Sequence, residues 1–140
     1  MTRLLLPLVA AYLAGLAPVA GADFDRDVAP LLARRCLDCH SGPAPKGRLD
    51  LSRQKAARGV LTGKLDDVAL WQRVRDDEMP PKKPLPDAEK AILRRWVESG
   101  AKWGADPIDP FRVSTEHRAG YDWWSLRPVA QRTVPLEPAG

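Results

Sequence analysis

The sequence has few cysteines and histidines, the residues that most often combine to form a zinc site. Its 140 residues include only two cysteines, Cys36 and Cys39, and only two histidines, His40 and His117. A structural zinc site usually needs four cysteine or histidine ligands, and His117 lies far along the chain from the other three. These numbers disfavour a zinc site.

Strand patterns and long apolar runs are also scarce. No segment alternates apolar and polar residues as a half-buried strand does, so the cysteine pair lacks the βαβ setting of a thioredoxin-like redox site. Only residues 4–19 form a long apolar run. No cysteine lies directly at the end of that run, which argues against a lipoprotein anchor, and nothing later is apolar enough to cross a bilayer.

The N-terminus has the pattern of a secretory signal peptide. Arg3 precedes the apolar run, and the small residues at 20–22 fit a cleavage site. We predict that residues 1–22 are removed and that the mature protein is periplasmic or otherwise exported, with no membrane attachment. The alternative is an uncleaved anchor, but the run is short for a spanning helix and contains two prolines.

A short motif at positions 36–40, Cys-Leu-Asp-Cys-His, has the form of a c-type haem attachment site. Two thiols three positions apart each add to one haem vinyl group, and the adjacent histidine binds the iron. We therefore expect one covalent haem c, with Cys36 and Cys39 as anchors and His40 as the proximal ligand. A simple disulfide would leave His40 unexplained.

The second axial ligand has few candidates. Met79 is the only methionine after the predicted signal peptide, and it lies in a proline-rich stretch that stiffens a loop. We predict that Met79 and His40 both bind the iron. His117 is the rival, but its polar surroundings at positions 114–118 predict a surface residue.

Helical spacing of apolar residues predicts an all-α domain. The first helix begins near Phe24 and runs into the haem motif, with Pro30 acceptable only in a first turn. A short helix is expected over 52–58 with Gly59 as its stop. The last helix is expected over 87–99, with acidic residues near its start, an apolar face that includes Leu93 and Trp96, and Gly100 as its stop.

A third helix is expected between these, with Asp66 or Asp67 as its cap. It carries Leu70, Trp71 and Val74 on its apolar stripe. Trp71, Trp96 and Trp103 are candidates for packing around a haem, although aromatic residues at helical spacing are more often ordinary core. We assign them no redox role.

The C-terminal part differs in composition from the rest. Residues 105–140 contain several prolines and no sustained periodicity, with aromatic residues at Tyr121, Trp123 and Trp124. We interpret them as a linker-like tail. The predicted domains are the signal peptide 1–22, the haem domain 23–104 and this tail.

The charge is too weakly basic to indicate nucleic-acid binding. There are 22 lysines and arginines against 18 aspartates and glutamates, a formal charge of +4. The basic residues are scattered among acidic ones without interleaved aromatic residues, so solvated helix faces explain them better than a nucleic-acid surface.

Four separated motifs resemble the Planctomycete-type cytochrome c domain over residues 24–103. They are DRDVAPLL at 25–32, GRLDL at 47–51, MPP at 79–81 and LRRWVESGAKW at 93–103. The resemblance implies a compact cytochrome c fold of about four helices, with His40 and Met79 as axial ligands. In that family the domain often precedes larger modules, and residues 122–129 are similar to the linker ahead of them.

Electron transfer is the function that this ligand set predicts. A histidine and methionine pair leaves no open coordination position and raises the potential of the iron. We expect no enzymatic activity, and the partner is a redox protein or a fused C-terminal module. Two alternatives remain: a redox module of a larger catalytic assembly, and a five-coordinate haem enzyme of the peroxidase type.

Overall fold

The computed structural model describes residues 21–126 and 128, and the described part is all helical, as predicted. No strand occurs within it. The predicted signal peptide lies almost wholly outside the described residues. The elements in chain order are η1 (Phe24–Val28), α1 (Ala29–Arg35), η2 (Lys46–Arg48), α2 (Gln54–Ala57), η3 (Arg58–Val60), η4 (Leu65–Asp67), α3 (Ala69–Arg75), α4 (Asp87–Glu98), η5 (Pro110–Arg112) and η6 (Trp124–Leu126).

The first helical segment changes its hydrogen-bond pattern just before its proline. The wider π turn η1 begins after Asp23, whose carboxylate accepts a hydrogen bond from the backbone N–H of Arg26 at 2.8 Å. Pro30 then falls in the first turn of α1, where its missing N–H costs nothing. The chain stays helical up to the haem motif, as the sequence predicted.

The last predicted helix is also confirmed. Asp87 and Glu89 lie in the first turn of α4, where carboxylates interact favourably with the helix dipole. Its apolar face buries Leu93 and Trp96. The helix ends before Gly100, whose φ of +92° is a conformation that favours glycine.

Two details of the middle helices were predicted wrongly. Gly59 does not stop the second helix, because α2 continues directly into the 3₁₀ turn η3, which contains this glycine. Neither Asp66 nor Asp67 caps α3, because both lie in the separate turn η4 and the residue before α3 is Val68. Short turns joined end to end, rather than single capped helices, fill this part of the chain.

An aromatic cluster joins the two ends of the helical domain. The ring of Phe24 in η1 lies 4.5 Å from that of Trp103 and 5.7 Å from that of Trp96, measured between centroids. The indole N–H of Trp96 donates to the carbonyl of Lys102 at 2.7 Å. The two tryptophans are ordinary core, as their spacing predicted.

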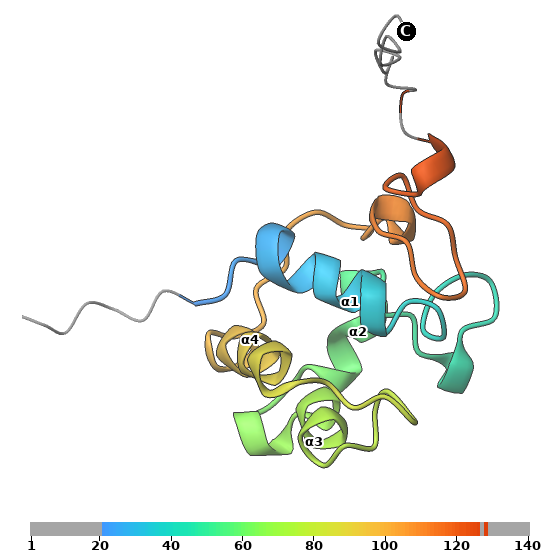
Figure 1. Cartoon of the computed structure of the whole chain (residues 1–140). Coiled ribbons are helices and arrows are strands. Elements are labelled where there is room, and N and C mark those ends of the chain that lie inside the picture. The colour runs from blue at the N-terminus through green and yellow to red at the C-terminus, as the bar shows by residue number, and fades with distance from the viewer. Residues whose placement is uncertain (1–20, 127, 129–140) are drawn as a thin grey trace, which may run out of the picture.

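The chain beyond α4 returns to α1. Figure 1 shows η5 on one side of α1 and the helices α3 and α4 on the other. η5 contacts α1, α3 contacts α4, and η1 contacts α4. Ile108 is buried in the same core as α1 and α3. Whether the haem domain ends at residue 104 stays a prediction, but the chain that follows is packed on it.

Candidate haem-binding site

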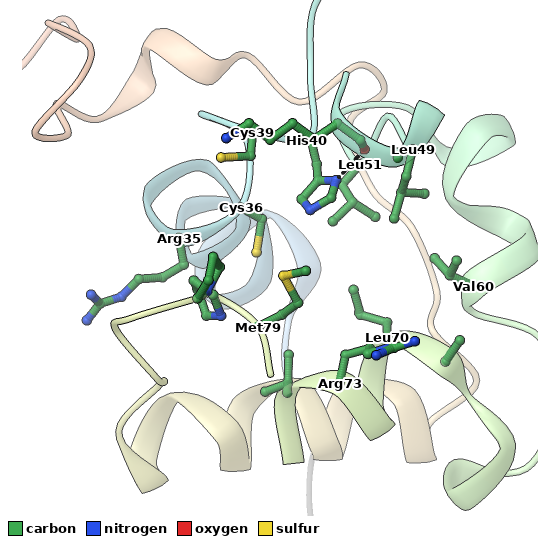
Figure 2. A pocket seen from close by; sticks show the side chains of 16 residues that line it. Arg35, Cys36, Cys39, His40, Leu49, Leu51, Val60, Leu70, Arg73 and Met79 are labelled. Atoms are coloured by element: carbon green, nitrogen blue, oxygen red, sulfur yellow. Dashed lines mark hydrogen bonds between the residues drawn. The ribbon is translucent and has the colours of Figure 1, made fainter. Parts of the chain in front are cut away.

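A cavity of about 580 Å³ lies between the end of α1, the loop that follows it, α3 and the turn at 79–81 (Figure 2). Its volume falls within the roughly 300–1,000 Å³ of small-molecule and cofactor pockets. All four residues predicted to hold haem line it. The lining consists of Arg35, Cys36, Cys39, His40, Lys46, Gly47, Leu49, Leu51, Val60, Ala69, Leu70, Arg73, Val74, Met79, Pro80 and Pro81.

The cysteine motif forms a tight turn at the C-terminal end of α1. The N–H of Cys36 donates to Leu32 at 2.8 Å, which places this cysteine at the helix cap. The N–H groups of Cys39 and His40 then both donate to the carbonyl of Cys36, at 3.1 and 2.9 Å. Buried Leu37 anchors the turn in the core. The turn therefore brings two thiols and an imidazole to one wall of the cavity.

His40 is oriented by the loop that follows the motif. Its Nδ1 lies 3.1 Å from the carbonyl oxygen of Lys46. A carbonyl can only accept, so Nδ1 carries the proton and Nε2 keeps its lone pair for a metal. The loop is itself held, because Lys46 N–H donates to Cys39 at 2.8 Å and Leu51 N–H donates to His40 at 2.8 Å. Metal-binding histidines commonly have such a partner.

Met79 enters the cavity from the other wall. The N–H groups of Glu78 and Met79 both donate to the carbonyl of Arg73, at 2.9 and 3.0 Å, so the turn is tied to the C-terminal part of α3. Figure 2 shows the methionine side chain pointing into the cavity, with the His40 ring entering from the opposite side of the view. The residue is 39% exposed. The fold therefore brings both predicted axial ligands to one space.

Three cationic side chains line the cavity, those of Arg35, Lys46 and Arg73, and no aspartate or glutamate among the described residues does. Arg35 forms a bidentate pair with Glu89 at 2.8 and 3.1 Å. Arg73 likewise pairs with Glu78, so two of the three cations already have carboxylate partners. The apolar lining would contact the ring of a haem. The residues present therefore fit a haem.

The surroundings of the Cys36 thiol favour its neutral form. Burial raises the pKa of the Cys36 thiol to about 12, and the carboxylate of Glu89 acts in the same direction. Both cysteines are free. A neutral thiol suits an apolar wall, because desolvation penalises the charged form.

The structure also bears on the alternatives. Within the described residues, no group of three or more histidine, cysteine, aspartate or glutamate side chains is placed to hold a metal ion. His117 is exposed and lies outside the cavity lining. Trp71, Trp96 and Trp103 are absent from the lining as well.

Sequence reasoning missed several residues of the site. The role of the Lys46 carbonyl has no sequence signal, because any residue type supplies a backbone oxygen. Arg35 and Arg73 were not distinguishable from other surface arginines. Leu70 and Val74 were recognised as one stripe of a helix, but their place on the cavity wall depends on how α3 packs.

Comparisons with known proteins agree with the geometry. Residues 36–83 match the family model described as Planctomycete cytochrome C. No curated protein and no solved structure gave a significant match. Within residues 21–126, no helix has the length and apolar character needed to cross a bilayer. The segment that contains the cysteine motif, the cavity loop and Met79 is therefore similar to Planctomycete-type cytochrome c domains, a class of haem proteins that are typically exported.

Proposed function

We propose that this domain transfers single electrons through one haem c, attached by Cys36 and Cys39 and ligated by His40 and Met79. The observation that carries the proposal is the hydrogen bond from His40 Nδ1 to the Lys46 carbonyl, in a cavity that also contains both thiols and the thioether. A free Nε2 opposite a methionine is the donor set of an electron-transfer site.

When bound, the haem iron would supply a one-electron couple, and a thioether ligand raises its potential. The residues of the protein would attach the haem and supply the ligands of its iron. The two cysteines would form thioethers, and His40 is held by its backbone partner at a set ring orientation. Met79 would fill the sixth position and exclude oxygen, peroxide or other small ligands. This disfavours the peroxidase alternative, since catalysis needs an open position.

The cellular setting is part of the same proposal. Haem attachment to c-type cytochromes takes place outside the cytoplasm, so we infer that residues 1–22 direct export and that the domain works in the periplasm or an equivalent compartment. Its electron partner is a redox protein or a module fused beyond the described residues.

The test begins with the exported full-length protein. After denaturation it should retain haem covalently, and the native oxidised spectrum should contain a methionine–iron charge-transfer band. Met79→Ala should remove that band and lower the reduction potential. Leu70→Ala, which also changes the cavity lining but removes no ligand atom, should keep the band.

Two other outcomes would each remove part of the proposal. Protein that releases its haem on denaturation would contradict the cysteine assignment and the whole function. Retained haem without the band, or a band that survives in Met79→Ala, would contradict the distal ligand alone and would favour an open sixth position.

A further inference from the structure

The segment after α4 is built into the haem domain rather than trailing from it. We call residues 105–121 the strap. At its beginning, the Asp106 carboxylate accepts a hydrogen bond from Gln54 N–H at 3.0 Å, which caps α2. The buried Ile108 donates its N–H to the Ser52 carbonyl at 2.7 Å. The strap is therefore fixed where it leaves the domain.

The rest of the strap closes on itself. Tyr121 N–H donates to the Phe111 carbonyl at 2.7 Å, and Thr115 N–H donates to Arg118 at 2.8 Å. Gly120 permits this closure, because a Cβ at that position would lie 2.4 Å from the carbonyl carbon of Val113. The closed loop holds the Arg118 backbone in place beside α1.

Arg118 reaches from the strap into the haem motif. Its Nη1 pairs with the carboxylate of Asp38, which lies between the two cysteines. Its Nη2 donates to the Ala33 carbonyl in α1 at 2.9 Å. The side chains are only 14% and 18% exposed, for Arg118 and Asp38 respectively. One guanidinium thus joins the end of the helix to the middle of the motif, 80 positions earlier.

Stability alone is a poor account of this contact. Burying two charges costs desolvation that the ion pair often does not recover. Within the described residues the Nε of Arg118 is also buried without a hydrogen-bond partner, which adds a further cost. The contact does hold two groups in place, because a planar guanidinium fixes the positions of its two acceptors, the Ala33 carbonyl and the Asp38 carboxylate, relative to each other.

We propose that Arg118 is a positioning residue for the haem site, which acts through Asp38 to set the turn that carries Cys39 and His40. Asp38 immediately precedes Cys39, and the same turn directs the His40 N–H to the Cys36 carbonyl. Fixing Asp38 against α1 therefore restricts the torsions that orient the imidazole. This inference rests on the proposed haem function.

The test compares Arg118→Ala, Asp38→Ala and the double variant in the haem-loaded full chain, since alanine removes the hydrogen-bonding group at either position. The readout is the set of His40 ring resonances, shifted by the iron in the oxidised protein, together with the thermal midpoint. Positioning predicts that all three variants displace these resonances to a similar extent and in the same direction, because each breaks the same contact. Glu116→Gln is the matched control, since it breaks an exposed strap ion pair with Lys83 and should leave the resonances unchanged.

Other patterns would overturn the inference. A through-space charge effect predicts opposite displacements in the two single variants and cancellation in the double. A merely structural contact predicts lower thermal midpoints with unmoved resonances. If Arg118→Ala yields no holoprotein, Asp38→Ala is compared with Asp38→Asn, which removes the charge but can still accept the hydrogen bond. Positioning then predicts displaced resonances in Asp38→Ala alone, and equal displacement in both variants overturns it. If the unmodified protein holds no covalent haem, the proposed function fails first, and the two failures are thereby distinguished.

Discussion

The two walls of the cavity are held in different ways. On the His40 wall, backbone hydrogen bonds connect the motif turn to its loop, and a side chain–backbone bond to Lys46 fixes the ring. On the Met79 wall, the backbone is tied to Arg73, but no hydrogen bond fixes the methionine side chain, which is 39% exposed. The polypeptide therefore orients the His40 ring by itself, whereas the Met79 side chain depends on the packing of its loop.

This difference follows from the chemistry of the two side chains. An imidazole has a second nitrogen that can donate to a backbone oxygen while the first binds metal. A thioether has no donor and only a weakly accepting sulfur, so its orientation can come only from its rotamers and neighbours. When a substitution or an added ligand disturbs the site, we expect the Met79 wall to open before the His40 wall.

The largest effect should come from removing the histidine. His40→Ala leaves both cysteines but deletes the imidazole, and no other histidine in the described part of the chain lines the cavity. We expect the low-spin absorption spectrum to be lost altogether. His117→Ala is the control, because that ring is exposed and outside the cavity. A normal low-spin spectrum in His40→Ala would contradict the assignment.

Replacing the methionine with a second histidine should have the next largest effect. Met79→His keeps both axial positions filled but exchanges a soft thioether for a nitrogen ligand, so the reduction potential should fall by on the order of 100 mV. Haem should remain covalently bound after denaturation. A redox titration measures the change, and an unaltered potential would mean that Met79 is not a ligand.

A pair of core substitutions compares the walls directly. Leu51 lies on the His40 wall and Leu85 lies in the loop between Met79 and α4, and both are buried. Each change to alanine should lower the free energy of unfolding by about 2–5 kcal/mol. Only Leu85→Ala should also increase the affinity for added imidazole, because it loosens the loop that carries the methionine.

Imidazole titrations of the oxidised proteins measure that difference. Equal affinities for imidazole in the two variants would show that both walls resist opening equally, which would contradict the expected difference between them. A higher affinity for imidazole in Leu51→Ala would show that the His40 wall opens more easily than the Met79 wall.

The smallest effect concerns the turn that presents the Lys46 carbonyl. Gly47 has a φ of +64° and open space where a Cβ would lie, so Gly47→Ala should cost about 1–2 kcal/mol through the backbone alone. Gly59→Ala is the control, since Gly59 has equally open surroundings without a positive φ. Thermal unfolding followed at the haem absorption compares them, and equal midpoints would mean that the turn tolerates the strain.

Much of the helical framework was predictable because its signals are local. The stripe of Leu93 and Trp96, with acidic residues at one end and Gly100 at the other, predicted α4 almost to the residue. The prediction was less accurate in the chain around Gly59 and Asp66, where several 3₁₀ turns follow one another. Such turns have too few residues to show a periodicity.

The strap shows the other limit of sequence reasoning. Its prolines and lack of periodicity predicted a linker-like tail, yet Ile108 is buried and Arg118 reaches Asp38. Nothing in the residues around Arg118 distinguishes it from a solvated arginine. Its role depends on a chain return that only the folded structure contains.

By itself, the sequence determined the chemistry of attachment, because two cysteines and a histidine within five residues need no distant partner to define a haem motif. The tertiary structure decided how that motif is held. The proton on His40 is placed by a carbonyl in the next loop, Met79 is brought to the same cavity by α3, and Asp38 is fixed from 80 residues away. These contacts join segments that lie far apart along the chain, and no sequence pattern indicates that they meet. Only the packing of the helices brings them together.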